Sequence, residues 1–306
     1  MKVLLAHLRN YIAEYFRWSI YLFTALWPVV IFSINYSLDF EDGLVDTLPT
    51  YGQRLVSFIL FHFIPFAVPA AFIAYHTNSK LFSSREFWAK ILLVFFMLAA
   101  YRSLRLYDFF CWSSMINGCL YWFRVFSRYI GLLMFLLPLL VFYRTDKKYL
   151  KSFYGMDLHF SSIRSYFPLL GIMAVIIFIA ALVSDDLQSY YPVYNRSGGP
   201  NYAVNNNIPQ WKTVLLFESS YLFNFLSTEF FFRGFFILAL GRLFGPHIVL
   251  PVACVYASIH FGKPFPEALS SISGGYILGV LTLKTENIWG GFFLHAGSAF
   301  FMELFA

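Results

Sequence analysis

The sequence has few charged side chains. Asp, Glu, Lys and Arg together make up 12% of its 306 residues, whereas 59% are hydrophobic and 22% are aromatic. Soluble globular domains carry about 25% charged residues, so an ordinary soluble domain is excluded. The composition predicts an all-α, polytopic membrane protein, because a helix satisfies its own backbone hydrogen bonds in lipid.

Cysteine is scarce as well, and so are signals of processing. Cys111, Cys119 and Cys254 are odd in number and lack metal-type spacing, so neither a disulfide framework nor a cysteine-based zinc site is indicated. The first 18 residues contain no apolar core followed by a small-residue cleavage site, which argues against a removable signal peptide. We expect small buried or interfacial cysteines and an amphipathic N-terminal lead into the first span.

The net charge of +6 is distributed between the apolar segments, a pattern typical of membrane topology rather than of nucleic-acid binding. Apolar stretches of spanning length predict eight or nine transmembrane helices. These stretches lie near residues 18–38, 55–75, 129–143, 167–184, 213–241, 247–261, 268–283 and 288–304, with a weaker one at 87–101. The loop charges favour an N-terminus inside and a C-terminus outside the cell (plasma) membrane.

One long polar interruption divides the chain. Residues 185–210 are rich in Asn, Tyr, Gly and Pro and are predicted to form an extramembrane loop. We distinguish an N-terminal transmembrane region with basic loops, residues 1–166, from a C-terminal transmembrane core, residues 167–306. The C-terminal part concentrates the polar residues that lie within spans.

Ionisable side chains within spans each cost about 3 kcal/mol and mark a function or a buried partner. In the C-terminal half they are Glu218, Glu229, Arg233, His260 and His295. Glu229 and Arg233 are spaced i, i+4 and therefore share one helix face. Such a pair either neutralises itself structurally or belongs to a site.

His260 and His295 lie on two further spans, and His295 is surrounded by small residues that let neighbouring helices approach closely. One carboxylate and two imidazoles from three spans can activate a water molecule or hold a metal ion. This interpretation requires the groups to converge to within about 7 Å of one another.

Three motifs follow one another in the C-terminal half: TEFFFRG (228–234), YASIHFGKPFPEAL (256–269) and GGYILGVLTLKTENIWGGFFLHAGSA (274–299). In this order they resemble the membrane-embedded CAAX protease and bacteriocin-processing (CPBP) family, which is related to type II CAAX prenyl endopeptidases. The family pattern is EExxxR, then FxxxH, then HxxxN or HxxxD. The resemblance covers roughly residues 213–304.

The resemblance assigns site residues position by position. Glu229 matches the second acid of the first motif, and Arg233 matches its arginine. Tyr256 stands at the aromatic position of the second motif, with His260 at its histidine, and His295 matches the histidine of the third. The resemblance implies that Glu229, Arg233, His260 and His295 are catalytic.

Two positions depart from the pattern. Thr228 stands where the first Glu is expected, and Ala299 stands where Asn or Asp is expected, so a second acid and a candidate oxyanion donor are missing. Glu218 precedes Glu229 by three helical turns, about 16 Å along the axis, and is too far to replace the acid. Glu267 is nearer, but it is expected to pair with Lys263.

The resemblance implies an intramembrane endopeptidase that hydrolyses a membrane-associated peptide or protein with a water activated by Glu and His. Glu229, His260 and His295 suit zinc numerically, and the alternative is a metal-free mechanism with Glu229 as the base. A catalytically impaired scaffold that binds a membrane peptide or protein stays open because of Thr228 and Ala299. A transporter with a proton relay is the least favoured function, since no second half mirrors the polar residues.

Overall fold

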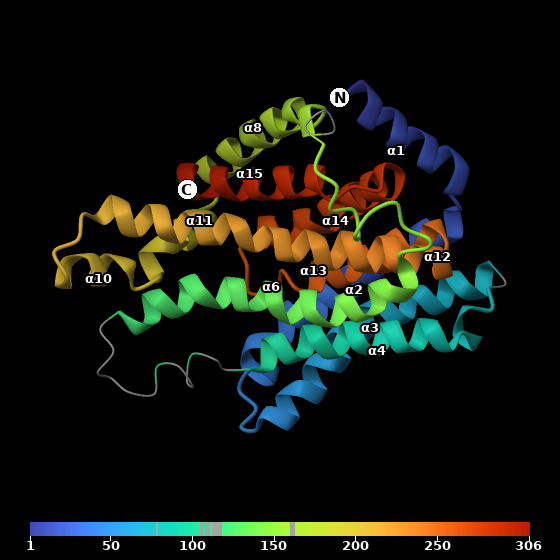
Figure 1. The fold of residues 1–306 in the computed structure, drawn as a ribbon, viewed down its shortest axis with the longest axis horizontal. Helices are drawn as coiled ribbons and strands as arrows, with labels where there is room; N and C mark the ends of the chain where they lie inside the picture. Colours follow the sequence, from blue (N-terminus) through green and yellow to red (C-terminus); the bar gives the residue numbers. More distant parts are fainter. Residues whose placement is uncertain (78, 105–106, 108–110, 112–117, 160–162) are drawn as a thin grey trace.

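The computed structural model describes the chain except residues 78, 105–106, 108–110, 112–117 and 160–162. All secondary-structure elements of the described residues are helices (Figure 1), as expected for backbone in lipid. The first half contains α1 (Lys2–Tyr15), α2 (Trp18–Leu38), η1 (Phe40–Val45), α3 (Tyr51–His76), η2 (Leu81–Ser83), α4 (Arg85–Ser103) and α6 (Cys119–Asp146). The second half contains α8 (Phe167–Val183), α9 (Asp185–Tyr190), η3 (Val193–Arg196), α10 (Gly199–Asn205), α11 (Gln210–Glu229), η4 (Phe230–Ala239), α12 (Leu240–Phe244), η5 (Pro246–Ile248), α13 (Val249–Ser258), α14 (Phe265–Thr285) and α15 (Trp289–Phe305).

The helices confirm an integral membrane protein. Among the residues that the structure describes, four helices are long and apolar enough to cross a bilayer by length and composition. They are Trp18–Leu38, Tyr51–His76, Cys119–Asp146 and the continuous α11–η4–α12 run, Gln210–Phe244. Two shorter apolar helices lie at Phe167–Val183 and Pro246–Ser258. The total of eight or nine spans stays a prediction.

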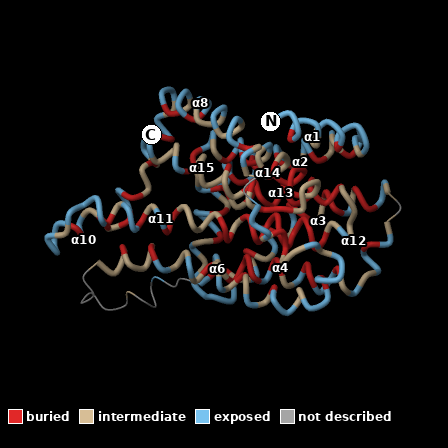
Figure 2. Tube along the Cα trace, turned by 45° about the horizontal axis from the view of Figure 1, so that its top comes forward, coloured by how far each residue is buried: buried red, intermediate tan, exposed pale blue. Residues whose placement is uncertain are grey.

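α13 forms the centre of the bundle. All ten of its residues are buried, and it packs against α14, α3 and α2. Figure 2 shows buried residues gathered around α13 and α14, whereas α1, α8 and α10 are largely exposed. The N-terminal lead is a helix, α1, whose Tyr11 hydroxyl donates to the carbonyl of Pro246 at 2.8 Å. α13 therefore lies at the buried centre of the molecule, and α14 packs directly against it.

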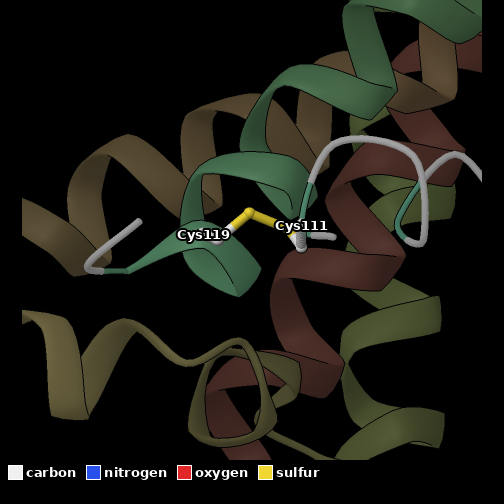
Figure 3. Close-up of a disulfide and its surroundings, with 2 residues drawn as sticks. All are labelled: Cys111 and Cys119. Atoms are coloured by element: carbon white, nitrogen blue, oxygen red, sulfur yellow. A yellow bond between two sulfur atoms is a disulfide. The ribbon is translucent and has the colours of Figure 1, made fainter. Parts of the chain in front are cut away.

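The two ends of the bundle have different chemistry. At one end, Cys111 and Cys119 form a disulfide (Figure 3). The expectation that the cysteines indicate no disulfide is therefore wrong for this pair, whereas Cys254 is free and buried, as expected. Counting cysteines missed the bond because the pairing depends on how the start of α6 meets the segment before it. We call this the disulfide end.

The predicted loop 185–210 lies at the disulfide end and contains helical turns, since α9, η3 and α10 fall within it. It packs beside the start of α6, where the rings of Tyr121 and Tyr202 stack at a centroid distance of 5.2 Å. It also reaches α14, because the Tyr191 hydroxyl donates to Glu267 Oε2 at 2.7 Å. This segment therefore connects the disulfide region to the start of α14.

The opposite end of the bundle, which we call the basic end, is held by ion pairs between helix termini. Lys284 at the end of α14 pairs with Glu14 at 3.4 Å, and Lys151 pairs with Glu286 at 3.1 Å. A buried pair between Lys90 Nζ and Asp146 Oδ1, 2.5 Å apart, joins α4 to α6. These contacts fix the side of the helices away from the disulfide.

Candidate active site

The first motif lies where an α-helix changes to a π-helix. Glu229 is the last residue of α11, and Arg233 lies one turn later in η4. Arg233 Nη1 is 3.5 Å from Glu229 Oε1, and both side chains are buried. π-helical turns are often found at functional sites. The spacing-based prediction of a direct pair is confirmed.

Glu229 also contacts the third motif. Glu229 Oε1 lies 3.1 Å from Nδ1 of His295 on α15. Gly291 allows this approach, because a Cβ at that position would collide with Glu229 Oε2. The small residues of α15 thus let the carboxylate of α11 reach the imidazole, as the sequence around His295 predicts.

The second motif adds a hydroxyl to the pair. The Tyr256 hydroxyl lies 3.1 Å from His295 Nε2, and the Arg233 guanidinium stacks over the Tyr256 ring at 4.1 Å. Gly275 of α14 gives the ring its space, since a Cβ there would lie 2.9 Å from Tyr256. Sequence reasoning treated Tyr256 only as an aromatic position. The signal for its role was the hydroxyl that a Phe would lack.

His260 follows α13 and is held by the backbone of Tyr256. Its Nδ1 is 2.7 Å from the carbonyl oxygen of Tyr256. Because a carbonyl only accepts, Nδ1 carries the hydrogen and Nε2 keeps a lone pair. The rings of His260 and His295 have centroids 6.5 Å apart, and their planes are inclined by 29°. Glu229 and His295 are in contact, and the rings of His295 and His260 lie within about 7 Å of each other. The catalytic roles of these residues stay a prediction.

A pocket of about 340 Å³ adjoins this cluster. Tyr256, His260 and His295 line it, whereas Glu229 is fully buried behind His295. The other lining residues come from α8, α14 and α15: Leu169, Met173, Ile176, Glu267, Ser270, Ser271, Ser273, Gly274, Ile277, Leu278, Leu294, Ser298 and Met302. A molecule in the pocket would therefore meet the two imidazoles and the phenol first.

The remaining acids lie outside the cluster. Glu218 lies beside Glu303 of α15 rather than beside Glu229, as its distance along α11 predicts. Glu267 pairs with Lys263 at 3.6 Å, as expected, and it also lines the pocket. The sequence around His62 offers it no polar companion within its own span. In the structure its Nδ1 lies 3.3 Å from Ser258 Oγ on α13.

The two departures from the family pattern have different surroundings. Thr228 is half-buried beside Glu229. Ala299 is fully buried in an apolar cluster with Phe217 and Tyr221 of α11. An Asn or Asp side chain at position 299 would meet these aromatic rings. The small apolar Ala299 therefore fits its surroundings better than the polar residue of the family pattern.

The predicted zinc site does not fit the side chains as they are placed. Among the described residues, no group of three His, Cys, Asp or Glu side chains is positioned to hold a metal ion. Glu229 Oε1 already contacts His295 Nδ1 and Arg233 Nη1. Zinc ligands must each reach within about 2.2 Å of one point.

Comparison with known proteins agrees with the motifs. No curated protein and no solved structure matches the chain. Residues 210–301 match the family model described as Rce1-like, type II CAAX prenyl endopeptidase Rce1-like. This match includes all three motifs and the glycines that bring their side chains together. Residues 210–301 are therefore similar to the Rce1-like family of the CAAX protease type, in agreement with the resemblance of the motifs.

Proposed function

We propose that the protein is an intramembrane endopeptidase that hydrolyses a membrane-associated peptide with a water activated by the Glu229–His295 pair. The observation that carries this proposal is the 3.1 Å contact between these residues from two helices, beside a pocket that His260 and Tyr256 also line. The match to a protease family supports it.

His295 is the base that meets the water. Glu229 accepts the hydrogen of its Nδ1, which orients the ring and compensates the imidazolium that forms when Nε2 takes a proton. Arg233, paired with the same carboxylate, holds Glu229 in place. Glu229 therefore acts through His295, whereas the sequence had favoured direct activation of water by the carboxylate.

Tyr256 is the electrophilic partner. In the free enzyme its hydroxyl donates to His295 Nε2 across 3.1 Å. When a peptide carbonyl enters, the hydroxyl turns to the developing oxyanion, and Nε2 becomes free to accept the proton of the attacking water. The C–N bond then breaks as His295 returns that proton to the amine leaving group.

His260 positions the water. Its Nδ1–H is used by the Tyr256 carbonyl, so its Nε2 lone pair accepts the hydrogen that the water retains. This role needs no change of protonation at His260, which distinguishes it from His295.

The pocket wall indicates the class of substrate. Leu169, Met173 and Ile176 of α8 provide an apolar side, while Ser270 and Ser273 of α14 provide hydroxyls. An extended peptide next to an apolar anchor satisfies both walls, because its backbone hydrogen-bonds to hydroxyls and its anchor contacts α8. A membrane peptide or protein fits this pocket.

The test is peptide cleavage by the purified protein in lipid vesicles. Glu229→Gln keeps the size of the side chain but removes its charge, and we expect cleavage to fall by about 10² or more. Glu218→Gln on the same helix is the matched control and should retain activity. Equal activity of Glu229→Gln and the parent would refute the proposal, and chelation of metal ions should leave cleavage unchanged.

A scaffold without hydrolytic activity is the second candidate. The observation that favours it is Ala299, which offers no oxyanion donor and is packed against aromatic rings. In that case the parent protein would bind membrane peptides and cleave none. Binding of a peptide that is unchanged by Glu229→Gln, together with no detectable hydrolysis, is the result that this alternative predicts.

A further inference from the structure

We infer that the pocket opens at the non-cytosolic face of the membrane, and that its substrate is a membrane-anchored peptide whose cleavage site is presented there. This inference rests on the proposed function and specifies its substrate. A C-terminal prenylated tail of a cytosolic protein would approach from the opposite face. Two independent observations, a disulfide and the distribution of basic residues, orient the protein, and the position of the pocket between these two ends gives the face on which it opens.

The disulfide identifies one face. Cys111 and Cys119 are bonded at the start of α6, and disulfides persist in oxidising compartments but are rare in the cytosol. Residues near this bond pack on the segment after α8, since a Cβ at Gly198 would lie 3.3 Å from Leu120. The disulfide end therefore belongs on the non-cytosolic face.

Basic residues identify the other face by a separate principle, the excess of Lys and Arg in cytosolic loops. The contact of Arg17 with the carbonyl of His76 and the pair of Arg242 with Glu86 place helix termini together at the basic end. The basic residues of this end and of its loops are more numerous than those near the disulfide end, such as Arg102, Arg196 and Lys212, and they include Arg17, Lys80, Arg85, Lys90, Arg144, Lys147, Lys148, Lys151, Arg164, Arg242 and Lys284. Charge and disulfide thus give the same orientation.

The polar part of the pocket lies at the disulfide end. Glu267, in the first turn of α14, lines the pocket and binds the Tyr191 hydroxyl of the segment that follows α9. A second contact also joins the start of α14 to α9, because the N–H of Phe265 donates to Asp186 Oδ2 at 2.8 Å. Ser270, one turn further into the pocket, is exposed. Hydroxyl and carboxylate groups therefore lead from this face toward His260.

From the basic end, the path to Glu229 is filled. Tyr166 is buried and packs against Gly290, where any Cβ would collide with its ring. The next residue, Gly291, contacts Glu229. A smaller pocket of about 230 Å³ lies on this side, lined by Val3, Leu4, His7, Ser165, Tyr166, Thr285 and Asn287. In the part of the chain that the structure describes, neither His295 nor His260 lines this pocket, and the buried Tyr166 lies between it and Gly290.

The anchor of the substrate has a place beside the same pocket. α8 packs on α15, and its pocket-lining residues Leu169, Met173 and Ile176 continue into an exposed apolar face with Ile172, Val175 and Ile179. An apolar anchor can lie along α8 in the lipid while the adjacent peptide meets the serines of α14. The substrate is therefore a peptide that leaves the membrane on the non-cytosolic side.

Orientation can be measured without activity. In a Cys254→Ala background, single variants Ser270→Cys in the pocket, Val204→Cys at the disulfide end and Lys148→Cys at the basic end are treated with a membrane-impermeant maleimide on intact cells. We expect labelling of the first two, and labelling of Lys148→Cys only after permeabilisation. If Ser270→Cys is protected in intact cells together with Lys148→Cys, the inference is overturned.

The substrate is tested with one reporter peptide fused to a single transmembrane helix in either orientation. Vesicles with inserted enzyme of known orientation should cleave the peptide displayed on the Val204 side at least tenfold faster, and Glu229→Gln should abolish this cleavage. Preferred cleavage on the Lys148 side overturns the inference while leaving the protease proposal intact. No cleavage on either side would overturn the protease proposal, and labelling would still decide the orientation.

Discussion

His295 Nδ1 lies 3.1 Å from Glu229 Oε1, although 66 positions separate the two residues. An ionised carboxylate only accepts hydrogen bonds, so Nδ1 is the protonated nitrogen and Nε2 is directed to the Tyr256 hydroxyl. The three side chains form one line from the buried carboxylate to the pocket. In the proposed mechanism Glu229 orients His295, His295 takes the proton of water and Tyr256 stabilises the oxyanion, so removing each side chain should affect a different step.

Tyr256→Phe should lower kcat by about 10²–10³ with little change in KM, because one oxyanion donor is lost while the ring still packs under Arg233. Cleavage of a fluorogenic membrane peptide measures both constants. Tyr276→Phe is the matched control, since its hydroxyl contacts Tyr21 away from the site. A Tyr256→Phe variant as fast as the parent would exclude the hydroxyl from catalysis.

Gly291→Ala tests whether the close approach of α15 to Glu229 is needed. The added Cβ collides with Glu229 Oε2, and a displacement of about 1 Å in a catalytic group costs about 10²-fold in rate. Gly171→Ala, which meets no atom within 4 Å, is the control and should keep full activity. Thermal unfolding of both variants separates misplacement from misfolding; a fully active Gly291→Ala would contradict the geometry.

Much of the fold could be predicted because a backbone in lipid must satisfy its own hydrogen bonds, which favours helices. The first predicted span, 18–38, coincides with α2, and the Glu229–Arg233 pair follows from spacing within one helix. The match over residues 210–301 likewise follows the order of the motifs.

Contacts between helices were harder to predict. Two contacts depend on which helix faces meet: the burial of Glu229 behind His295 and the position of the Tyr256 hydroxyl. The Cys111–Cys119 bond depends on how the chain turns before α6. Spacing along one chain carries no such information. Gly291 and Gly275 show why, since their lack of a side chain sets distances that only the packed structure reveals.

Thr228→Glu restores the acid that the family pattern has before Glu229. Because His295 already receives the proton in the proposed mechanism, we expect kcat to change by less than about tenfold, or less than about 1.4 kcal/mol. Thr228→Gln controls for the size of the side chain. Activity that arises only in the Glu variant would instead support the scaffold function of the parent.

Glu41 gives a prediction for stability outside the spans. Its side chain in η1 is buried and paired with Arg102. Burial raises the pKa of Glu41 from its ordinary 4.5 to about 7; Arg102 opposes this change, and Asp42 and Asp46 add to it. The folded protein therefore holds this proton more tightly than the unfolded chain, so the associated stability is present below pH 4.5 and is lost as the pH rises to about 7.

A difference of about 2.5 pH units corresponds to about 3 kcal/mol of unfolding free energy. Glu41→Gln imitates the protonated carboxyl, so it should remove most of the decline in Tm that the parent shows between about pH 5 and about pH 7. Glu14→Gln, at an exposed position, should keep the parent's slope. Unfolding in detergent followed by tryptophan fluorescence measures all three proteins. A parent Tm that rises across this interval relative to Glu41→Gln would reverse the sign, and would mean that the pairing with Arg102 outweighs the burial of the carboxylate.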